Sequence, residues 1–251
     1  MEGSSDRQLT DIEKKAVRAK VGELLWISLM TRPDLSYDIN AISSEASKAT
    51  VQTAKELNKI VRKAKDTKSV LRFGRLGDIN EVTVKVYADA SFGNQDEGTR
   101  STAGRVVLLE HKENASVNIA SWKTKKIARV CRSVKAAETR ALEDAIDDAV
   151  NSARLIKEIY SGYIDLKNPA QVPVEAITDC KSLWESIHNS KQCEEKILRN
   201  SIAGIKELID LNMLKSVQWV PTDKQLADAL TKKGKKADWL LSVASTNKLA
   251  Y

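Results

Sequence analysis

Four carboxylates stand where separate segments of this sequence would meet. Asp89 and Asp179 each follow a run with the composition of a β-strand. Glu138 lies in the first turns of a long helical pattern, and Asp228 lies near the start of the last one. Strand ends at one edge of an α/β sheet converge, so these groups can be brought together. Carboxylates gathered in this way repel one another unless Mg²⁺ or Mn²⁺ binds between them, which favours two-metal cleavage of a phosphodiester.

Glu138 is the most informative of the four. The residues that share its helical face are all apolar: Val134, Ala141, Leu142 and Ala145. A carboxylate on an apolar stripe is costly unless it is paired, and a metal ion is one such partner. Asp89 and Asp179, taken singly, favour the simpler interpretation of turn formers or helix caps. The four acids together, in this order of elements, favour a metal site.

The residues up to about Arg75 are expected to be helical. Apolar side chains recur at helical spacing in a first segment: Ile12, Ala16, Ala19, Leu24, Ile27 and Leu29. Pro33 can open a second helix. A third, amphipathic segment carries Val51, Ala54, Leu57, Ile60 and Val61. Its opposite face is basic, which is more typical of solvated surface than of a phosphate-binding stripe.

Strand periodicity begins at Val82, where apolar and polar residues alternate. Two more strands are expected at about 103–109 and 116–122, then a helix at 133–160 and a strand at 172–178. Helices from about Ser182 and from Glu194 to Leu211, a strand at 217–220 and a helix after Thr222 complete the order. Thr222 and Gln225 would form a capping box for that last helix. This order predicts an α/β fold with a mixed five-stranded sheet, three antiparallel strands plus parallel ones. We expect a helical segment at 1–78 and a sheet-containing domain at 79–251.

Composition limits the partners and the compartment. The 251 residues include 41 Lys plus Arg and 34 Asp plus Glu, a net charge of +7, which makes nucleic acid a plausible partner. Three cysteines and two histidines, with no C-x-x-C pair, argue against a zinc site or a disulfide framework. The sequence has no membrane-length apolar run and no signal peptide at its start. We expect an intracellular protein, cytoplasmic or nuclear, that is not secreted and has no membrane partner.

The order of the four carboxylates resembles a type 1 ribonuclease H, and the surrounding residues resemble the copia-type retrotransposon version at the end of a reverse transcriptase. The motifs that carry this resemblance are Tyr87-Ala88-Asp89-Ala90-Ser91, Ser121-Trp122-Lys123-Thr124-Lys125-Lys126, Ala136-Ala137-Glu138-Thr139, Thr178-Asp179-Cys180-Lys181-Ser182-Leu183 and Trp219-Val220-Pro221-Thr222 through Lys232. Upstream, Thr31-Arg32-Pro33-Asp34-Leu35 resembles the connection between polymerase and ribonuclease H in the same elements. The resemblance covers about Leu24 to Leu241.

This resemblance implies a ribonuclease H-like fold and metal-dependent cleavage of the RNA strand of RNA–DNA hybrids. The implied ligands of two Mg²⁺ or Mn²⁺ ions are Asp89, Glu138, Asp179 and Asp228. The candidate phosphate contacts are Lys123, Lys125, Lys126, Arg129, Arg132 and Lys135, each of which can equally be solvated surface. Trp122 is expected in the core rather than stacked on a base. The implied partners are the hybrid and the polymerase part of a reverse transcriptase, although this sequence has no Tyr-x-Asp-Asp polymerase motif.

One departure and two alternatives stay open. Many members of the broader superfamily carry a histidine shortly before the last aspartate, and the stretch from Pro221 to Ala227 has none, as is general in the copia-type pattern. A catalytically silent nucleic-acid-binding or docking module is the first alternative, and four intact carboxylates argue against it. An integrase or transposase of the same superfold is the second, and Glu138 with Asp228 disfavours it.

Overall fold

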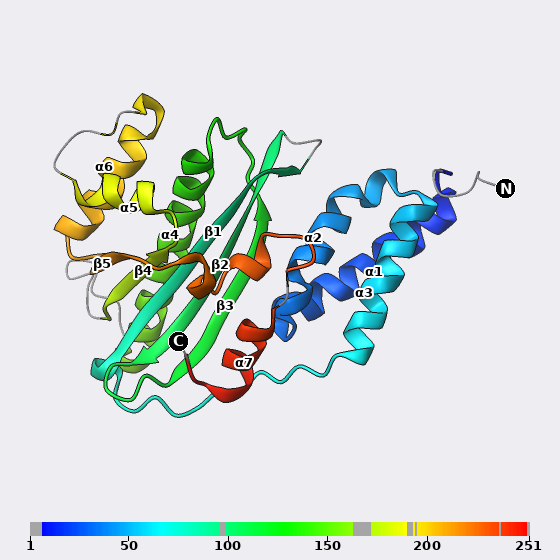
Figure 1. Ribbon diagram of the computed structural model, residues 1–251. Coiled ribbons are helices and arrows are strands. Elements are labelled where there is room, and N and C mark those ends of the chain that lie inside the picture. Colours follow the sequence, from blue (N-terminus) through cyan, green and yellow to red (C-terminus); the bar gives the residue numbers. More distant parts are fainter. Residues whose placement is uncertain are drawn as a thin grey trace.

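Five strands form one mixed sheet with helices on both of its faces (Figure 1). The computed structural model describes residues 7–95, 99–162, 172–189, 193, 195–235 and 237–249. The strands are β1 Val82–Gln95, β2 Arg100–His111, β3 Val117–Lys126, β4 Val174–Thr178 and β5 Ser216–Trp219, in the spatial order β3-β2-β1-β4-β5. The first three pair antiparallel, and β4 and β5 add parallel to them. The expected mixed five-stranded sheet is confirmed.

One face of the sheet is covered by α4 (Val134–Ser161), with α5 (Lys181–His188) and α6 (Arg199–Asp210) beside it (Figure 1). The helix α4 begins where the side chain of Ser133 accepts a hydrogen bond from the Ala136 backbone N–H, and it ends at Gly162 in the left-handed conformation. Val84, Val86 and Ala88 of β1 point into the core beneath α4. These residues alternate with Tyr87, which lies in the core on the other face, so the strand pattern read from the sequence is confirmed.

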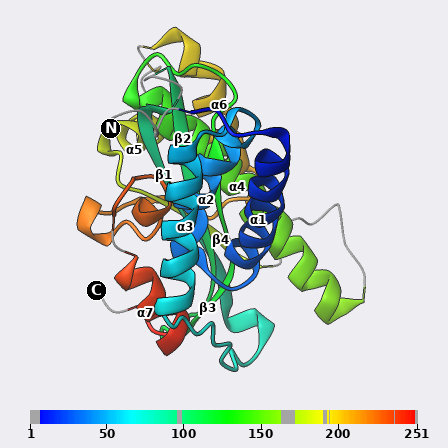
Figure 2. The same cartoon turned by 90° about the vertical axis from the view of Figure 1, so that its right-hand side faces the viewer.

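The N-terminal segment packs three helices around an apolar cluster of their own. They are α1 (Asp11–Met30), α2 (Ser36–Glu45) and α3 (Val51–Asp66). Figure 2 shows α1 and α3 in front of the sheet, on the side opposite α4. Pro33 opens a short 3₁₀ turn, η1 (Pro33–Leu35), just before α2. The boundary near residue 78 stays a prediction.

The buried face of α1 differs from the one expected. Val17, Val21 and Leu24 are buried, whereas Ile12 is 84% exposed and Leu29 is 48% exposed. The helix packs against its neighbours only along the stripe of Val17, Val21 and Leu24. The apolar residues expected to form one face are instead spread over two faces of the helix. In α3 the expected phase holds, because Leu57 and Ile60 are buried.

The C-terminal stretch also departs from expectation. No α-helix begins directly after Thr222; the described chain first makes two 3₁₀ turns, η6 (Thr222–Lys224) and η7 (Asp228–Leu230), and the next helix is α7 (Asp238–Thr246). The proposed capping box is wrong, because the Gln225 side chain donates to the Ala88 carbonyl of β1 and accepts from the Ala227 N–H. These bonds draw the chain onto the sheet, where a regular helix does not form.

Other expected elements lie close to their predicted places. The helix expected from Glu194 is the 3₁₀ turn η5 (Lys196–Leu198) followed by α6, and Glu194 itself is outside the described residues. None of the described helices is long and apolar enough to cross a membrane.

Candidate active site

The site lies where β1 and β4 stop pairing. Their parallel register ends at Tyr87 and Ile177, while β1 continues beside β2 through Ser91. Asp89 is therefore inside a strand rather than at its end, which corrects the sequence expectation. Asp179 directly follows β4, as expected. The fork between the two strands leaves room for both carboxylates next to the first turns of α4.

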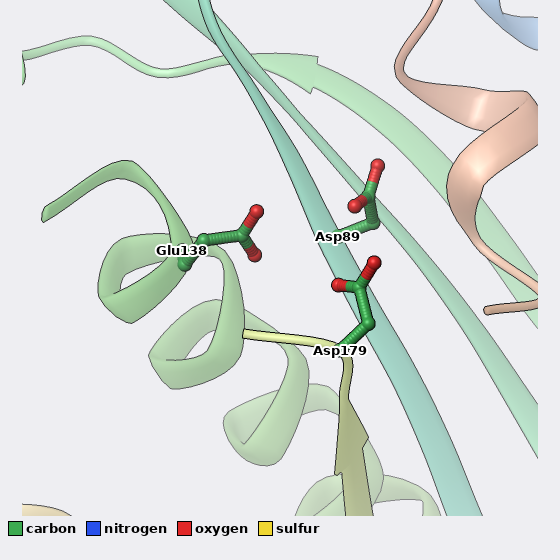
Figure 3. A group of neighbouring side chains, drawn as sticks. All are labelled: Asp89, Glu138 and Asp179. Carbon is green, nitrogen blue, oxygen red and sulfur yellow. The ribbon is translucent and has the colours of Figure 1, made fainter. Parts of the chain in front are cut away.

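Three of the four predicted carboxylates come together at this fork. One oxygen from each of Asp89, Glu138 and Asp179 lies within 4.8 Å of the others, and the three side chains point toward one another (Figure 3). Asp89 is 1% exposed and Glu138 is 6% exposed, while Asp179 is half-buried. The cluster thus brings together acid groups from β1, from the residue after β4 and from α4, and water barely reaches two of the three.

Of the three carboxylates, Glu138 has the fewest partners that could stabilise its negative charge. Its Oε2 atom is buried and has no hydrogen-bond partner among the described residues. Burial raises the pKa of Glu138 well above its ordinary value, and the charges of Asp89 and Asp179 raise it further, against a hydrogen bond with the backbone of Ala90. The apolar stripe identified in the sequence is the cause, because α4 packs directly on β1 at this point.

Asp89 is held by a residue of the C-terminal stretch. The Thr231 hydroxyl donates a hydrogen bond to Oδ2 of Asp89 and also contacts the Asp228 carbonyl. Burial raises the pKa of Asp89 to about 7, and the neighbouring acids raise it as well, while Thr231 and the charge of Lys232 lower it.

Asp228 has a different environment from the other three. It is buried in η7 but ion-pairs with Lys232 through Oδ1 and with Lys235, whose Nζ lies 2.5 Å from Oδ2. Burial alone would raise the pKa of Asp228, but the two lysines outweigh it and hold the pKa below its ordinary value. Asp228 is a charged neighbour of Asp89 without belonging to the three-carboxylate cluster.

Sequence reasoning missed Thr231, Lys232 and Lys235 as parts of the site. Lys232 is four residues after Asp228, which places the two side chains on one face if the stretch were helical, and this was a usable signal. Lys232 ion-pairs with Asp228, and the charges of Asp89, Asp228 and Asp179 favour its protonated form against burial, so its pKa is raised. Lys235 offers no such periodic signal.

The six candidate phosphate contacts occupy β3, the loop after it and the first turn of α4. Lys123 and Lys125 are exposed on β3, and Arg129 and Arg132 are exposed in the loop. Lys125 pairs with Asp144 in a solvent-accessible ion pair, and Lys135 donates to the Ser186 hydroxyl at 2.7 Å. Lys126 is half-buried at the end of β3. Their role in binding nucleic acid stays a prediction.

Two other residues singled out in the sequence are accounted for by packing. Trp122 is buried, and its indole N–H donates to the Ser28 carbonyl of α1 at 2.7 Å, so it is a core residue as expected. His188 stacks on Trp184 in α5, with ring centroids 4.5 Å apart.

No protein-family model matches this chain. The chain is similar to the retrovirus-related Pol polyprotein from transposon RE1 of Arabidopsis thaliana, with 27% identity over 228 residues, 91% of this chain and 14% of that protein. The chain therefore spans about a seventh of the length of that relative. It is also 30% identical over 131 residues to the secreted RxLR effector protein 161 of Plasmopara viticola, covering 52% of this chain and 86% of that protein.

Among solved structures, the chain is similar to the N-terminal RNase H domain of Rv2228c from Mycobacterium tuberculosis. The identity is 19%, the TM-score is 0.41, and the match covers 60% of this chain and 91% of that chain.

Proposed function

Since this chain is a homologue of the retrovirus-related Pol polyproteins of Arabidopsis transposons, we propose that it is a ribonuclease H that hydrolyses the RNA strand of RNA–DNA hybrids. The observation that carries the proposal is the cluster of Asp89, Glu138 and Asp179 with oxygens within 4.8 Å. Each of these three acids stands in one of the motifs that resemble the ribonuclease H of copia-type elements.

The donor set fits hard divalent cations. Carboxylate oxygens are the ligands that Mg²⁺ and Mn²⁺ prefer, and buried like charges at this spacing need a positive charge between them. The unpartnered Oε2 of Glu138 supports the same assignment, since a buried carboxylate oxygen without a donor is costly. Asp89, Glu138 and Asp179 would hold the ions, and Asp228 would join them once released from its lysines.

The ions, when bound, lower the pKa of a water and stabilise the leaving oxygen of a phosphodiester. The chain's own residues supply the geometry for this. Thr231 orients the Asp89 carboxylate by donating to one oxygen, which leaves the other for a ligand. Burial of Asp89 and Glu138 excludes water that would weaken the electrostatic interactions of the site.

Lys232 and Lys235 have a second use in this proposal. They neutralise Asp228 in the free protein, and both side chains are 40–50% exposed, so they can turn outward to a phosphate of the substrate. The exchange would uncover Asp228 when nucleic acid arrives.

The substrate class follows from the shape rather than from a base sequence. Hybrid and RNA duplexes are recognised through phosphates and 2′-hydroxyls across a shallow groove. Lys123, Lys125, Lys126, Arg129, Arg132 and Lys135 are proposed to contact the phosphates beside the carboxylate cluster. Hybrid binding should then weaken steeply with added salt as counterions are released, and a flat salt dependence would contradict this surface.

The test is cleavage of an end-labelled RNA–DNA hybrid with Mg²⁺, Mn²⁺ or EDTA, comparing wild type, Asp89→Asn and Asp223→Asn. Asp223 is an exposed acid in η6, so its variant controls for the loss of one negative charge near the site. We expect metal-dependent RNA cleavage in wild type and the control, and none in Asp89→Asn. A folded wild type that binds the hybrid without cutting it would favour the silent binding module instead.

A further inference from the structure

The helix α2 of the N-terminal segment is connected to the carboxylate site by two paths of side-chain interactions. The first begins at Tyr37, a buried residue whose hydroxyl lies near the side chain of Asn94 in β1; burial and Asp38 raise the pKa of this hydroxyl, and Asn94 lowers it. Asn94 accepts from the Thr102 hydroxyl at 2.9 Å, which fixes its amide orientation, and its Nδ2 donates to the Thr231 carbonyl at 2.9 Å. The path ends at the residue whose hydroxyl donates to Asp89.

The second path begins one turn later on the same helix. The Asn40 side-chain amide donates to the Thr124 carbonyl of β3 at 3.1 Å. The Thr124 hydroxyl is buried and donates to the Leu230 carbonyl at 2.9 Å. The two paths therefore end on the carbonyls of consecutive residues, Leu230 and Thr231, at the end of η7.

The turn η7 sits against the sheet at a place where nothing larger than glycine fits. A Cβ on Gly104 of β2, the register partner of Asp89, would lie 2.7 Å from Cγ2 of Thr231 and 2.9 Å from Cβ of Leu230. The position of η7 is thus set by its close contact with Gly104 of the sheet and by the two paths, which hold the carbonyls of Leu230 and Thr231. The same turn carries Asp228, so its placement decides where two of the four carboxylates point.

We propose that Tyr37 and Asn40 of α2 are positioning residues for the carboxylate site, which hold η7 so that Thr231 orients Asp89 and Asp228 faces it. The N-terminal segment is then a part of the catalytic machinery in the functional sense, although none of its residues touches the reacting atoms. This assignment rests on the proposed function for its catalytic consequence, but the coupling itself is a property of the chain.

The physical basis is the precision that metal ligation demands. Ligands must be held within about 0.5 Å of a productive geometry by supporting groups that are themselves locked. Loss of such an outer partner typically costs about 10–100-fold in metal affinity or activity. A 3₁₀ turn of three residues cannot supply that rigidity alone, because its own hydrogen bonds are few and poorly aligned.

A second contact between the N-terminal segment and the sheet allows the positioning of η7 to be tested separately from the mere attachment of the segment. Trp122 also joins the N-terminal segment to the sheet, through its hydrogen bond to the Ser28 carbonyl of α1. Among the described residues, the Trp122 side chain makes no hydrogen bond to η7 or to a carboxylate. Trp122 shares an apolar cluster with Leu230, and Trp122→Phe keeps an aromatic ring there while it removes the hydrogen bond to Ser28, so it serves as the matched control.

The experiment compares wild type, the double variant Tyr37→Phe/Asn40→Ala and Trp122→Phe, all as the full chain. Mn²⁺ affinity is measured by electron paramagnetic resonance, backbone hydrogen exchange is followed over 225–231, and melting temperature is recorded. We expect the double variant to bind Mn²⁺ about tenfold more weakly and to exchange faster over 225–231. With hybrid substrate, its kcat should fall while KM stays unchanged. Trp122→Phe should lower the melting temperature with neither change.

Four outcomes are distinguished. Unchanged Mn²⁺ affinity and exchange in a folded double variant would overturn it, as would equal changes in Trp122→Phe. If the double variant does not fold, Tyr37→Phe alone keeps the ring and its packing and is judged by the same criteria. If wild type binds no Mn²⁺ and cuts no hybrid, the proposed function fails, and the exchange measurement over 225–231 then decides the coupling by itself.

Discussion

The N-terminal segment and the sheet both bury charge, but they treat it in opposite ways. In the segment, Arg32 and Asp34 form a two-pronged ion pair with both bonds at 2.8 Å and side-chain exposures of 9% and 2%. Arg32 also donates to the Ala64 carbonyl, which ties α3 to the start of α2. At the fork of the sheet, Asp89 and Glu138 are buried beside each other and beside Asp179, and no lysine or arginine among the described residues forms an ion pair with Glu138.

The difference separates structural charge from functional charge. A buried charge whose partners are all supplied by the chain serves the fold, since it is neutralised as soon as the protein folds. A buried charge that lacks a partner is retained at a cost in stability, and this is typical of sites that bind a cation or perform catalysis. Removing one group at a time should distinguish the charges that stabilise the fold from those that serve the site.

Glu138→Gln should have the largest effect on activity and almost none on stability. We expect metal-dependent hybrid cleavage to fall by at least about 100-fold, because loss of even an outer partner of a metal ligand typically costs 10–100-fold. The melting temperature should stay the same or rise, because the change removes an uncompensated buried acid. Glu158→Gln, at an exposed position of the same helix, should change neither measurement. A large drop in melting temperature for Glu138→Gln would make it a structural residue.

Arg32→Met should have the reverse pattern, a large loss of stability. It leaves Asp34 buried and unpaired, which costs about 3–5 kcal/mol. Urea unfolding measures this. The control is Lys20→Met, which breaks an ion pair exposed on both sides and should shift the unfolding free energy by less than about 0.5 kcal/mol. Equal effects of the two changes would remove the basis for calling the Arg32–Asp34 pair structural.

Gly104→Ala tests the contact between the sheet and η7. The added Cβ meets Thr231 and Leu230 at distances that force η7 to move, with a cost of about 1–3 kcal/mol and a loss of Mn²⁺ affinity. Gly204→Ala in α6 meets nothing within 4 Å and should stabilise the protein by up to about 1 kcal/mol. Wild-type Mn²⁺ binding in Gly104→Ala would show that the position of η7 does not matter to the site.

The smallest effect is expected at Glu13, whose charge is satisfied but exposed. Hydrogen bonds from Arg7 first, and then from the Thr10 cap of α1, together lower the pKa of Glu13 from 4.5 to about 2. A carboxyl pKa depressed by folding stabilises the folded state above the ordinary pKa, and this contribution is lost as pH falls from about 4.5 to about 2. The free energy of unfolding, measured with urea between pH 7 and pH 2, should therefore fall slightly more steeply for wild type than for Glu13→Gln. Parallel curves would mean that this cap contributes nothing measurable.

The elements that were predicted well are those with a strong local pattern. Alternation around Val84 and Val86 places one row under α4, and the apolar stripe around Glu138 places that acid against β1. The phase of α1 was wrong because several of its faces carry apolar side chains, and only the packing partner selects one of them. The stretch after Thr222 was wrong because Gln225 bonds to Ala88 across the fold in place of capping a helix.

The sequence by itself determined the order of the five strands and the four candidate carboxylates, of which three meet, because side-chain periodicity and strand ends are set by neighbours within a few residues. Tertiary structure alone decided what surrounds them: the ion pairs of Asp228 with lysines, the close contact of η7 with Gly104, and the hydrogen bond from the Thr231 hydroxyl to Asp89, 142 residues away in the chain. The physical reason is that such contacts depend on how whole elements pack, and a shift of one element by a single residue would change every partner.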